Sequence, residues 1–417
     1  MGRITDKTRC SFGKRRIYML AGAIPWGISF VLLWLVPTGD SQFMKFLYYV
    51  FIYMLFCTFW TIVYIPYNTL SANMTNDYDE RTSLTTFRII LANVGILLGA
   101  AVFSVLAEGK ESVFYAIAGS EKGAYLYSAI CFAVLAVALM LLCTFNVHER
   151  VDTSAENSYG FFSTLKQFFK LKEFRSASMY YLLSMLGFDV IMTVYMFYVS
   201  DTLGFGGGVT AMIFVAIPLV CAMLSAPFWT WLSEKKSKTF AYCVSAICAT
   251  VSFFMTMFIP VGNGVMLGIV AGLGGLSMSA IQIIPWAVIP DVVDIDEYKN
   301  GVRREGAIFG LTSFLYKLAN GVAIAIVGVV LGAFGYVEGA GSYIDVVEGF
   351  QQPESALLAI RILISCLPGT IFLLSLIFSR KSDFNRSRMA EIHAELDRRR
   401  EQKETSVTVE QTEKISE

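Results

Sequence analysis

Residues 46–66 read FLYYVFIYMLFCTFWTIVYIP, a stretch of 21 residues without a charged side chain. The hydrocarbon core of a bilayer is crossed by a helix of about 20 mostly apolar residues, each adding about 1.5 Å of length. This stretch lies in an apolar run over residues 43–66. The run therefore predicts a transmembrane helix.

The rest of the chain has the same character. Apolar side chains make up 55% of its 417 residues and the mean hydropathy is +0.59, whereas soluble proteins are roughly 45 to 50% apolar. We expect an all-α polytopic membrane protein with ten transmembrane helices. The other nine runs are residues 17–37, 85–106, 123–147, 177–200, 209–232, 239–260, 263–290, 306–334 and 356–379.

The positive charges indicate the orientation of these helices. If the amino terminus lies inside, the inner segments hold 27 Lys and Arg residues and the outer loops hold two, Lys110 and Lys122. Cytoplasmic loops of membrane proteins carry such an excess. The sequence thus predicts a multi-pass plasma (inner) membrane protein with both termini in the cytoplasm. Net charge is zero, so charge offers no argument for a nucleic-acid partner.

A pattern in the first half of the chain is repeated in the second. Pro66-Tyr67-Asn68 precedes an acidic segment that ends in an arginine, and Pro285-Trp286 precedes another. Such an echo is typical of two related bundle halves. We predict four domains: an incomplete N-terminal bundle of four helices (1–147), an amphipathic cytoplasmic linker (148–176), a C-terminal six-helix bundle (177–379) and a charged tail (380–417).

Four blocks in order carry a family resemblance: residues 6–16, residues 66–70 with 77–82, residues 285–291 with 303–306, and residues 352–361. At these blocks the sequence resembles the glycoside-pentoside-hexuronide:cation symporters, the melibiose-carrier branch of the major facilitator superfamily. The resemblance implies two six-helix bundles. It also implies that this chain begins after the first two helices of the family, of which the second ends in cation-binding aspartates.

Charges inside the apolar runs are candidate substrate-binding residues, because a charge in the bilayer is costly unless it is paired or faces a polar cavity. Arg88 lies roughly 10 Å beyond Arg81 along a helix, and Lys317 roughly 20 Å beyond Arg304. The alternative for both is a structural ion pair or inter-helix clamp. Asp189 is either a cavity residue or a helix-packing hydrogen-bond acceptor.

The remaining candidates for substrate binding are aromatic and amide side chains. They are Gln282, Trp286, Tyr67 and Asn68, near proline-broken helix ends, and Tyr64, where the family sometimes carries a sugar-facing aspartate. Interfacial aromatic belts use the same residue types.

Charged residues at the inner helix ends are candidate gating residues, which would lock and release the two bundles during rocking. They lie in the first basic segment and in the acidic loops expected after residues 66 and 290: Asp6, Arg9, Asp77, Asp79, Glu80, Arg81, Asp291, Asp294, Arg303, Arg304 and Glu305. A second basic turn, residues 233–238, occupies the corresponding place later in the chain, and ordinary positive-inside anchoring explains that turn equally well.

These features together favour a secondary active transporter that carries a sugar or glycoside with Na⁺ or H⁺ by alternating access. We expect a monomer in the lipid bilayer with no cofactor beyond the coupling cation and no metal site. An enzyme is not expected, because no nucleotide-binding loop, metal-ligand cluster or activated nucleophile is apparent. Two alternatives stay open: a truncated or degenerate protein that does not transport, and a transporter of lipid-like or anionic amphiphiles, favoured by Tyr64 and the aromatic residues.

Overall fold

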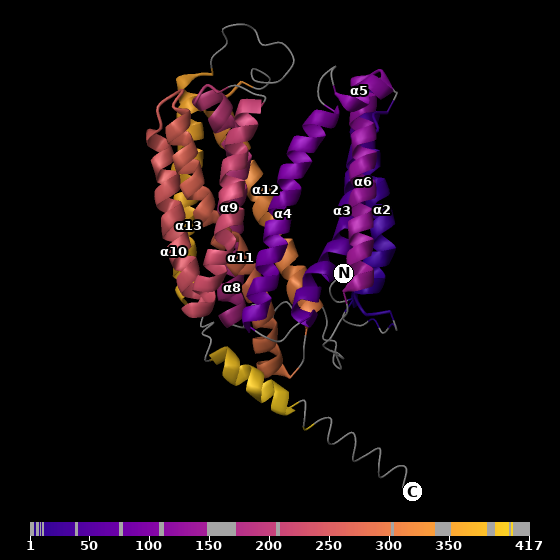
Figure 1. The fold of residues 1–417 in the computed structure, drawn as a ribbon, viewed down its shortest axis with the longest axis vertical. Coiled ribbons are helices and arrows are strands. Elements are labelled where there is room, and N and C mark those ends of the chain that lie inside the picture. Colours follow the sequence, from indigo (N-terminus) through magenta and orange to yellow (C-terminus); the bar gives the residue numbers. More distant parts are fainter. Residues whose placement is uncertain are drawn as a thin grey trace. The chain divides into compact units, whose positions relative to one another are not determined.

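The computed structural model describes residues 4–5, 8, 10, 12–37, 41–74, 78–107, 112–147, 172–205, 209–301, 304–337, 352–381, 388–399 and 402. Throughout these ranges the regular structure is helical, and ten helices are long and apolar enough to cross a membrane. They coincide with the ten apolar runs, which confirms the predicted all-α polytopic fold (Figure 1).

The long helices are α2 (Arg16–Trp34), α3 (Gln42–Met74), α4 (Tyr78–Ala107), α6 (Glu121–Asn146), α8 (Lys172–Phe197), α9 (Val209–Lys235), α10 (Lys238–Met255), α11 (Gly264–Asn300), α12 (Glu305–Ala333) and α13 (Glu354–Lys381). Three short elements accompany them: α5 (Val113–Ala118), the π-helical turn η1 (Tyr198–Thr202) and the 3₁₀ turn η2 (Thr256–Phe258). Local signals fix several ends. Ser237 caps α10 by accepting a hydrogen bond from the Phe240 amide, and Gly301, with φ of +68°, ends α11.

The prediction that helices are broken at their prolines is wrong. Helix α3 runs through Pro66, and α11 runs through Pro285 and Pro290. A bilayer penalises open backbone groups, and neighbouring polar side chains can satisfy those that a proline frees. Around Pro66, side chains add hydrogen bonds to the helix backbone: Asn68 donates to the Tyr64 carbonyl at 2.9 Å and Thr69 donates to the Pro66 carbonyl at 2.8 Å.

The prediction of an acidic loop after residue 290 is also wrong. Asp291, Asp294 and Asp296 lie in the last turns of α11. Val292, Val293 and Ile295 alternate with them and are buried, so both the apolar and the acidic side chains of this segment face protein. Asp79 and Glu80 likewise lie in α4 and not in a loop.

The chain divides into two compact units. The first comprises residues 1–75, 91–154 and 305–313, and the second comprises residues 76–90, 155–304 and 314–417. Within the first unit α2 packs against α3 and α6; within the second, α8 packs against α13 and α11, and α10 against α11 and α13. The domain boundaries predicted from the sequence stay a prediction, and most of the predicted linker, residues 148–171, lies outside the described ranges.

Helices α9 and α11 of the second unit approach each other closely at Gly275. A Cβ atom there would lie 2.2 Å from the carbonyl oxygen and 2.6 Å from the Cα atom of Pro218, whereas at Gly268 the nearest atom, Cδ1 of Ile217, is 3.8 Å away. We expect Gly275→Ala to lower the free energy of unfolding in detergent by about 1–3 kcal/mol or more, since a backbone cannot move aside as a flexible side chain can. Gly268→Ala is the matched control on the same helix, and equal stabilities of the two variants would contradict this packing.

Candidate functional site

Two of the predicted site residues meet in the second unit. Arg88, half-buried on α4, places its guanidinium carbon 4.9 Å from the centre of the Trp286 ring on α11. The Trp286 ring is held in turn by Tyr181 of α8, at 5.1 Å between ring centroids and in an edge-on arrangement. Nearby, Thr86 and Thr230 share a hydrogen bond of 2.5 Å, which fixes this part of α4 on α9. Arg88 and Trp286 thus form a cation and aromatic face, here called the Arg88–Trp286 pair.

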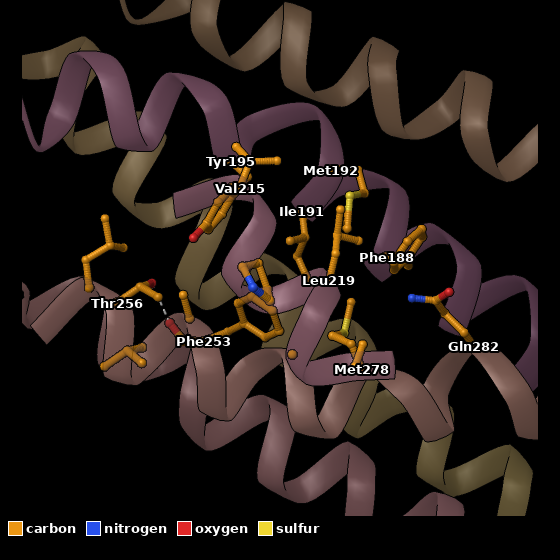
Figure 2. Close-up of a pocket in the computed structure, with 16 residues that line it drawn as sticks. Phe188, Ile191, Met192, Tyr195, Val215, Leu219, Phe253, Thr256, Met278 and Gln282 are labelled. Atoms are coloured by element: carbon orange, nitrogen blue, oxygen red, sulfur yellow. Dashed lines mark hydrogen bonds between the residues drawn. The ribbon is translucent and has the colours of Figure 1, made fainter. Parts of the chain in front are cut away.

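Gln282 lies one helical turn before Trp286 on α11 and lines a pocket enclosed by α8, α9, α10, η2 and α11. Figure 2 shows its amide at one end of the pocket and Thr256 at the other. Most of the other lining residues are apolar. The hydroxyls of Tyr195 and Thr256 donate to backbone carbonyls, at 3.0 and 2.6 Å. Among the described residues none is a hydrogen-bond partner of the Gln282 amide, so this group is available to a ligand.

The two other charged candidates of this unit lie on α8 and α12. Asp189 is 5% exposed and its Oδ2 atom has no hydrogen-bond partner within the described ranges. The side chain of Asn320, on α12, lies at hydrogen-bonding range of this carboxyl group. Lys317, one turn before Asn320 on the same helix, is exposed.

The predicted residues of α3 lie in the first unit. Tyr64 stacks on Trp60, at 4.2 Å between centroids and 16° between planes. Asn68 is 1% exposed and gives its amide to the Tyr64 carbonyl, so at least one of its donors serves the helix around Pro66. Tyr67 is half-buried. The Trp60 and Tyr64 rings form an aromatic face, of which Tyr64 alone was among the predicted site residues.

The end of α11 carries three buried carboxylates, each with a basic partner in the same unit. Asp291 pairs with Lys238 at 2.8 Å, and both side chains are at most 1% exposed. Asp294 pairs with His393 at 3.0 Å. Asp296 accepts two hydrogen bonds from Arg304, at 2.6 and 3.0 Å. We call Asp291, Asp294 and Asp296 the acidic end of α11.

Another buried ion pair occurs in the first unit. Arg15, which precedes α2, donates to the carboxylate of Glu305, the first residue of α12, and their side chains are 2% and 1% exposed. Of the other predicted gating residues, Glu80 is exposed on α4. Asp79 and Arg81 lie on α4 with side chains outside the description, and Asp6, Arg9, Asp77 and Arg303 lie outside the described ranges altogether.

The partners Arg15, Lys238 and His393 were not among the predicted site residues. Lys238 is the first residue of α10, and its sequence context is that of an ordinary lysine that anchors a helix end at the membrane surface. Only its position opposite Asp291, 53 residues away along the chain, gives it a partner. His393 belongs to a tail helix over residues 388–399, whose Met389, Ile392 and Leu396 are buried at helical spacing.

The arrangement is suited to the binding of a ligand. It offers a cation over an aromatic ring, an open amide in an apolar pocket and a buried carboxyl group. No group of three or more His, Cys, Asp or Glu side chains that could hold a metal ion occurs among the described residues.

A sequence model of the family described as MFS/sugar transport protein matches residues 1–382. The chain belongs to this family. The resemblance to the melibiose-carrier branch agrees with this match. The family and the fold are those of membrane transporters, which sit in the bilayer and carry small molecules.

Relatives of this MFS/sugar transport family member are symporters. The inner membrane symporter YicJ of Escherichia coli K12 is 28% identical over 91% of this chain and 79% of its own length. The sodium-dependent lysophosphatidylcholine symporter 1 of Xenopus tropicalis is 26% identical over 84% of this chain and 70% of its own length. Among solved structures, the E. coli fucose:proton symporter FucP has the same fold, with a TM-score of 0.61 at 13% identity over 92% of this chain and 86% of its own.

Proposed function

We propose that this protein is a cation-coupled symporter of a sugar or glycoside that works by alternating access. The observation that carries the proposal is the Arg88–Trp286 pair, inside a chain that belongs to a transporter family. Aromatic faces stack on sugar rings, and a guanidinium donates paired hydrogen bonds to hydroxyl or carboxylate oxygens. Arg88, held in place by the Trp286 ring, would therefore donate to the oxygens of one sugar ring, with Gln282 one turn away as a further hydrogen-bonding group.

Lys317, Asp189, Tyr64, Tyr67 and Asn68 are proposed to contribute to the same binding function. The buried pairs at the acidic end of α11 and the Arg15–Glu305 pair are proposed as gating contacts, because buried charges resist separation unless other groups replace their partners. We propose further that both termini lie in the cytoplasm, as the charge asymmetry indicates, and that the protein acts as a monomer in the inner membrane.

A second candidate function, transport of a lipid-like amphiphile, is supported by the pocket in Figure 2. Its walls of Phe188, Met192, Leu219 and Met278 would hold an alkyl chain, and the Gln282 amide would hold a polar group at its end. A lysophosphatidylcholine symporter is among the relatives. The sugar proposal has the Arg88–Trp286 pair in its favour, because a charged group on an aromatic face fits a polar ring better than an alkyl chain.

Uptake into proteoliposomes tests these two functions. The purified protein is reconstituted and offered radiolabelled glycosides or labelled lysophosphatidylcholine, with a Na⁺ gradient, a proton gradient or neither. We expect accumulation of a glycoside that depends on one of the two gradients and is not reduced by lysophosphatidylcholine.

Accumulation of the lysophospholipid alone would replace the sugar proposal by the amphiphile proposal. Glycoside uptake unaffected by removal of both gradients would overturn cation coupling. Liposomes without protein, and liposomes with protein inactivated by heat, are the controls for leakage and surface adsorption.

A further inference from the structure

The carboxyl group of Asp189 lies deep in the membrane-spanning part of α8. It is about 20 Å from Thr202, the nearer end of its span, at 1.5 Å per residue. The side chain is 5% exposed, and its helical neighbours Phe188, Ile191 and Met192 line the apolar pocket. A carboxylate in such surroundings loses its hydration and needs a partner that replaces water.

The residues around Asp189 replace only part of the water that its carboxylate loses. Asn320 lies within hydrogen-bonding range, but the Oδ2 atom has no hydrogen-bond partner among the residues that the structure describes. The nearest hydroxyl along α8, that of Thr193, donates to the backbone carbonyl of Asp189 at 2.7 Å and does not serve the carboxyl group. No ion pair of Asp189 with Lys, Arg or His occurs within the described ranges.

The helices that pack against α8 have few titratable groups level with Asp189. Phe372 of α13 lies against Gly187, two residues before Asp189, and shows which part of α13 is level with it. Residues 275–286 of α11 and 367–375 of α13 contain none. Helix α9 contributes Cys221, and α12 contributes Tyr316 and Lys317. Helix α10 contributes Tyr242, which shares a hydrogen bond with Ser184 of α8, and α4 contributes Arg88, which lies against Trp286. The charged residues farther along the packed elements have partners of their own: Asp201 with Tyr336, Arg361 with the Met257 carbonyl, Asp291 with Lys238, Asp294 with His393, and Asp296 with Arg304.

We propose that the Asp189 carboxyl group, with the Asn320 amide beside it, is a proton-binding site, and that this proton is the coupling ion of transport. An asparagine suits both states of such a site, because its NH₂ group donates to a carboxylate and its oxygen accepts from a carboxylic acid. The second half of this inference rests on the proposed transport function, whereas proton binding itself does not.

A proton fits this site better than a sodium ion. A hard cation needs several oxygen ligands. Here the described residues supply one carboxyl group and one amide, and the Asp189 side chain is only 5% exposed. Lys317 lies three residues before Asn320 on α12, on the same side of that helix, and its approach to the released carboxylate would assist loss of the proton.

Infrared difference spectroscopy on the full-length protein in liposomes tests proton binding directly, by the C=O stretching band of a protonated carboxyl group. We expect the band at neutral pH in the wild type and its loss in Asp189→Asn. Asp201→Asn is the matched control in the same span, because the Asp201 oxygens accept from Ser200 and Tyr336 at 2.8 Å. Asp189→Glu, which keeps a carboxyl group, should shift the band without removing it.

Persistence of the band in Asp189→Asn would overturn the proton site. Its disappearance from the wild type on addition of NaCl at constant pH would also overturn it, in favour of a sodium site. Transport then tests coupling: Asp189→Asn should lose accumulation driven by a proton gradient, whereas the control Asp201→Asn should keep it. Equal accumulation by variant and wild type would refute coupling through Asp189, whereas absence of any uptake by the wild type would refute the proposed function and leave the spectroscopic result standing.

Discussion

Replacing Lys238 by methionine is expected to lower the free energy of unfolding by about 3–5 kcal/mol, because it leaves the buried carboxylate of Asp291 without its cation. The pair is fully enclosed: the two side chains are 1% and 0% exposed, and the Lys238 Nζ atom donates both to Asp291 at 2.8 Å and to the Ala287 carbonyl at 3.1 Å. Denaturant unfolding in detergent, followed by tryptophan fluorescence, measures the loss.

Two comparisons make this expectation specific. The double variant Lys238→Met with Asp291→Leu should recover most of the lost stability, since a buried ion pair replaced as a whole by apolar groups is often tolerated. Glu395→Gln breaks the ion pair with Arg399, in which the Glu395 side chain is 41% exposed and the Arg399 side chain 43%. This change should lower the free energy of unfolding by less than about 0.5 kcal/mol. A Lys238→Met variant as stable as the Glu395→Gln variant would show that the Lys238–Asp291 pair does not hold α10 on α11.

Replacing Arg88 by lysine is expected to reduce glycoside uptake by about 10- to 100-fold, the equivalent of one or two lost hydrogen bonds to a charged group. The charge is kept, so the loss would come from geometry. A lysine ammonium cannot lie flat over the Trp286 ring or donate two parallel hydrogen bonds, as the guanidinium can. Uptake at several substrate concentrations shows whether binding or turnover is lowered.

Arg361→Lys is the matched control. Arg361 also lies within a membrane span of the second unit, but its guanidinium donates to the Met257 carbonyl at 2.9 Å. This variant should transport as the wild type does. Wild-type uptake by Arg88→Lys would exclude the Arg88–Trp286 pair from the binding site, and an equal loss in both variants would indicate a general effect of weakened arginine contacts on folding.

Much of the fold could be predicted because a bilayer imposes one simple requirement on the chain. Each spanning segment must satisfy its own backbone hydrogen bonds, so a run of about 20 apolar residues is a helix whatever its neighbours are. That requirement explains why the ten runs match the ten candidate spans. It also explains the error at Pro285 and Pro290, since proline breaks helices in water more readily than in a protein interior that can satisfy the freed groups.

The candidate site was predictable in part, for the same physical reason. A charge inside an apolar run has to be compensated, so Arg88, Asp189 and Lys317 could be recognised without coordinates. Their partners could not. Trp286 lies 198 residues from Arg88 along the chain, and nothing in its local sequence distinguishes a binding-site ring from an interfacial one.

By itself, the sequence determined the class of the protein: its helices and the positions of its intramembrane charges, because hydrophobic length and the cost of buried charge are properties of single segments. The tertiary structure alone decided which groups compensate those charges. It gave Arg88 an aromatic face, Asp291 a lysine from another helix, and the Oδ2 atom of Asp189 no partner among the described residues. Pairing depends on which helix faces meet across the bundle, and that information is spread over segments far apart in the chain.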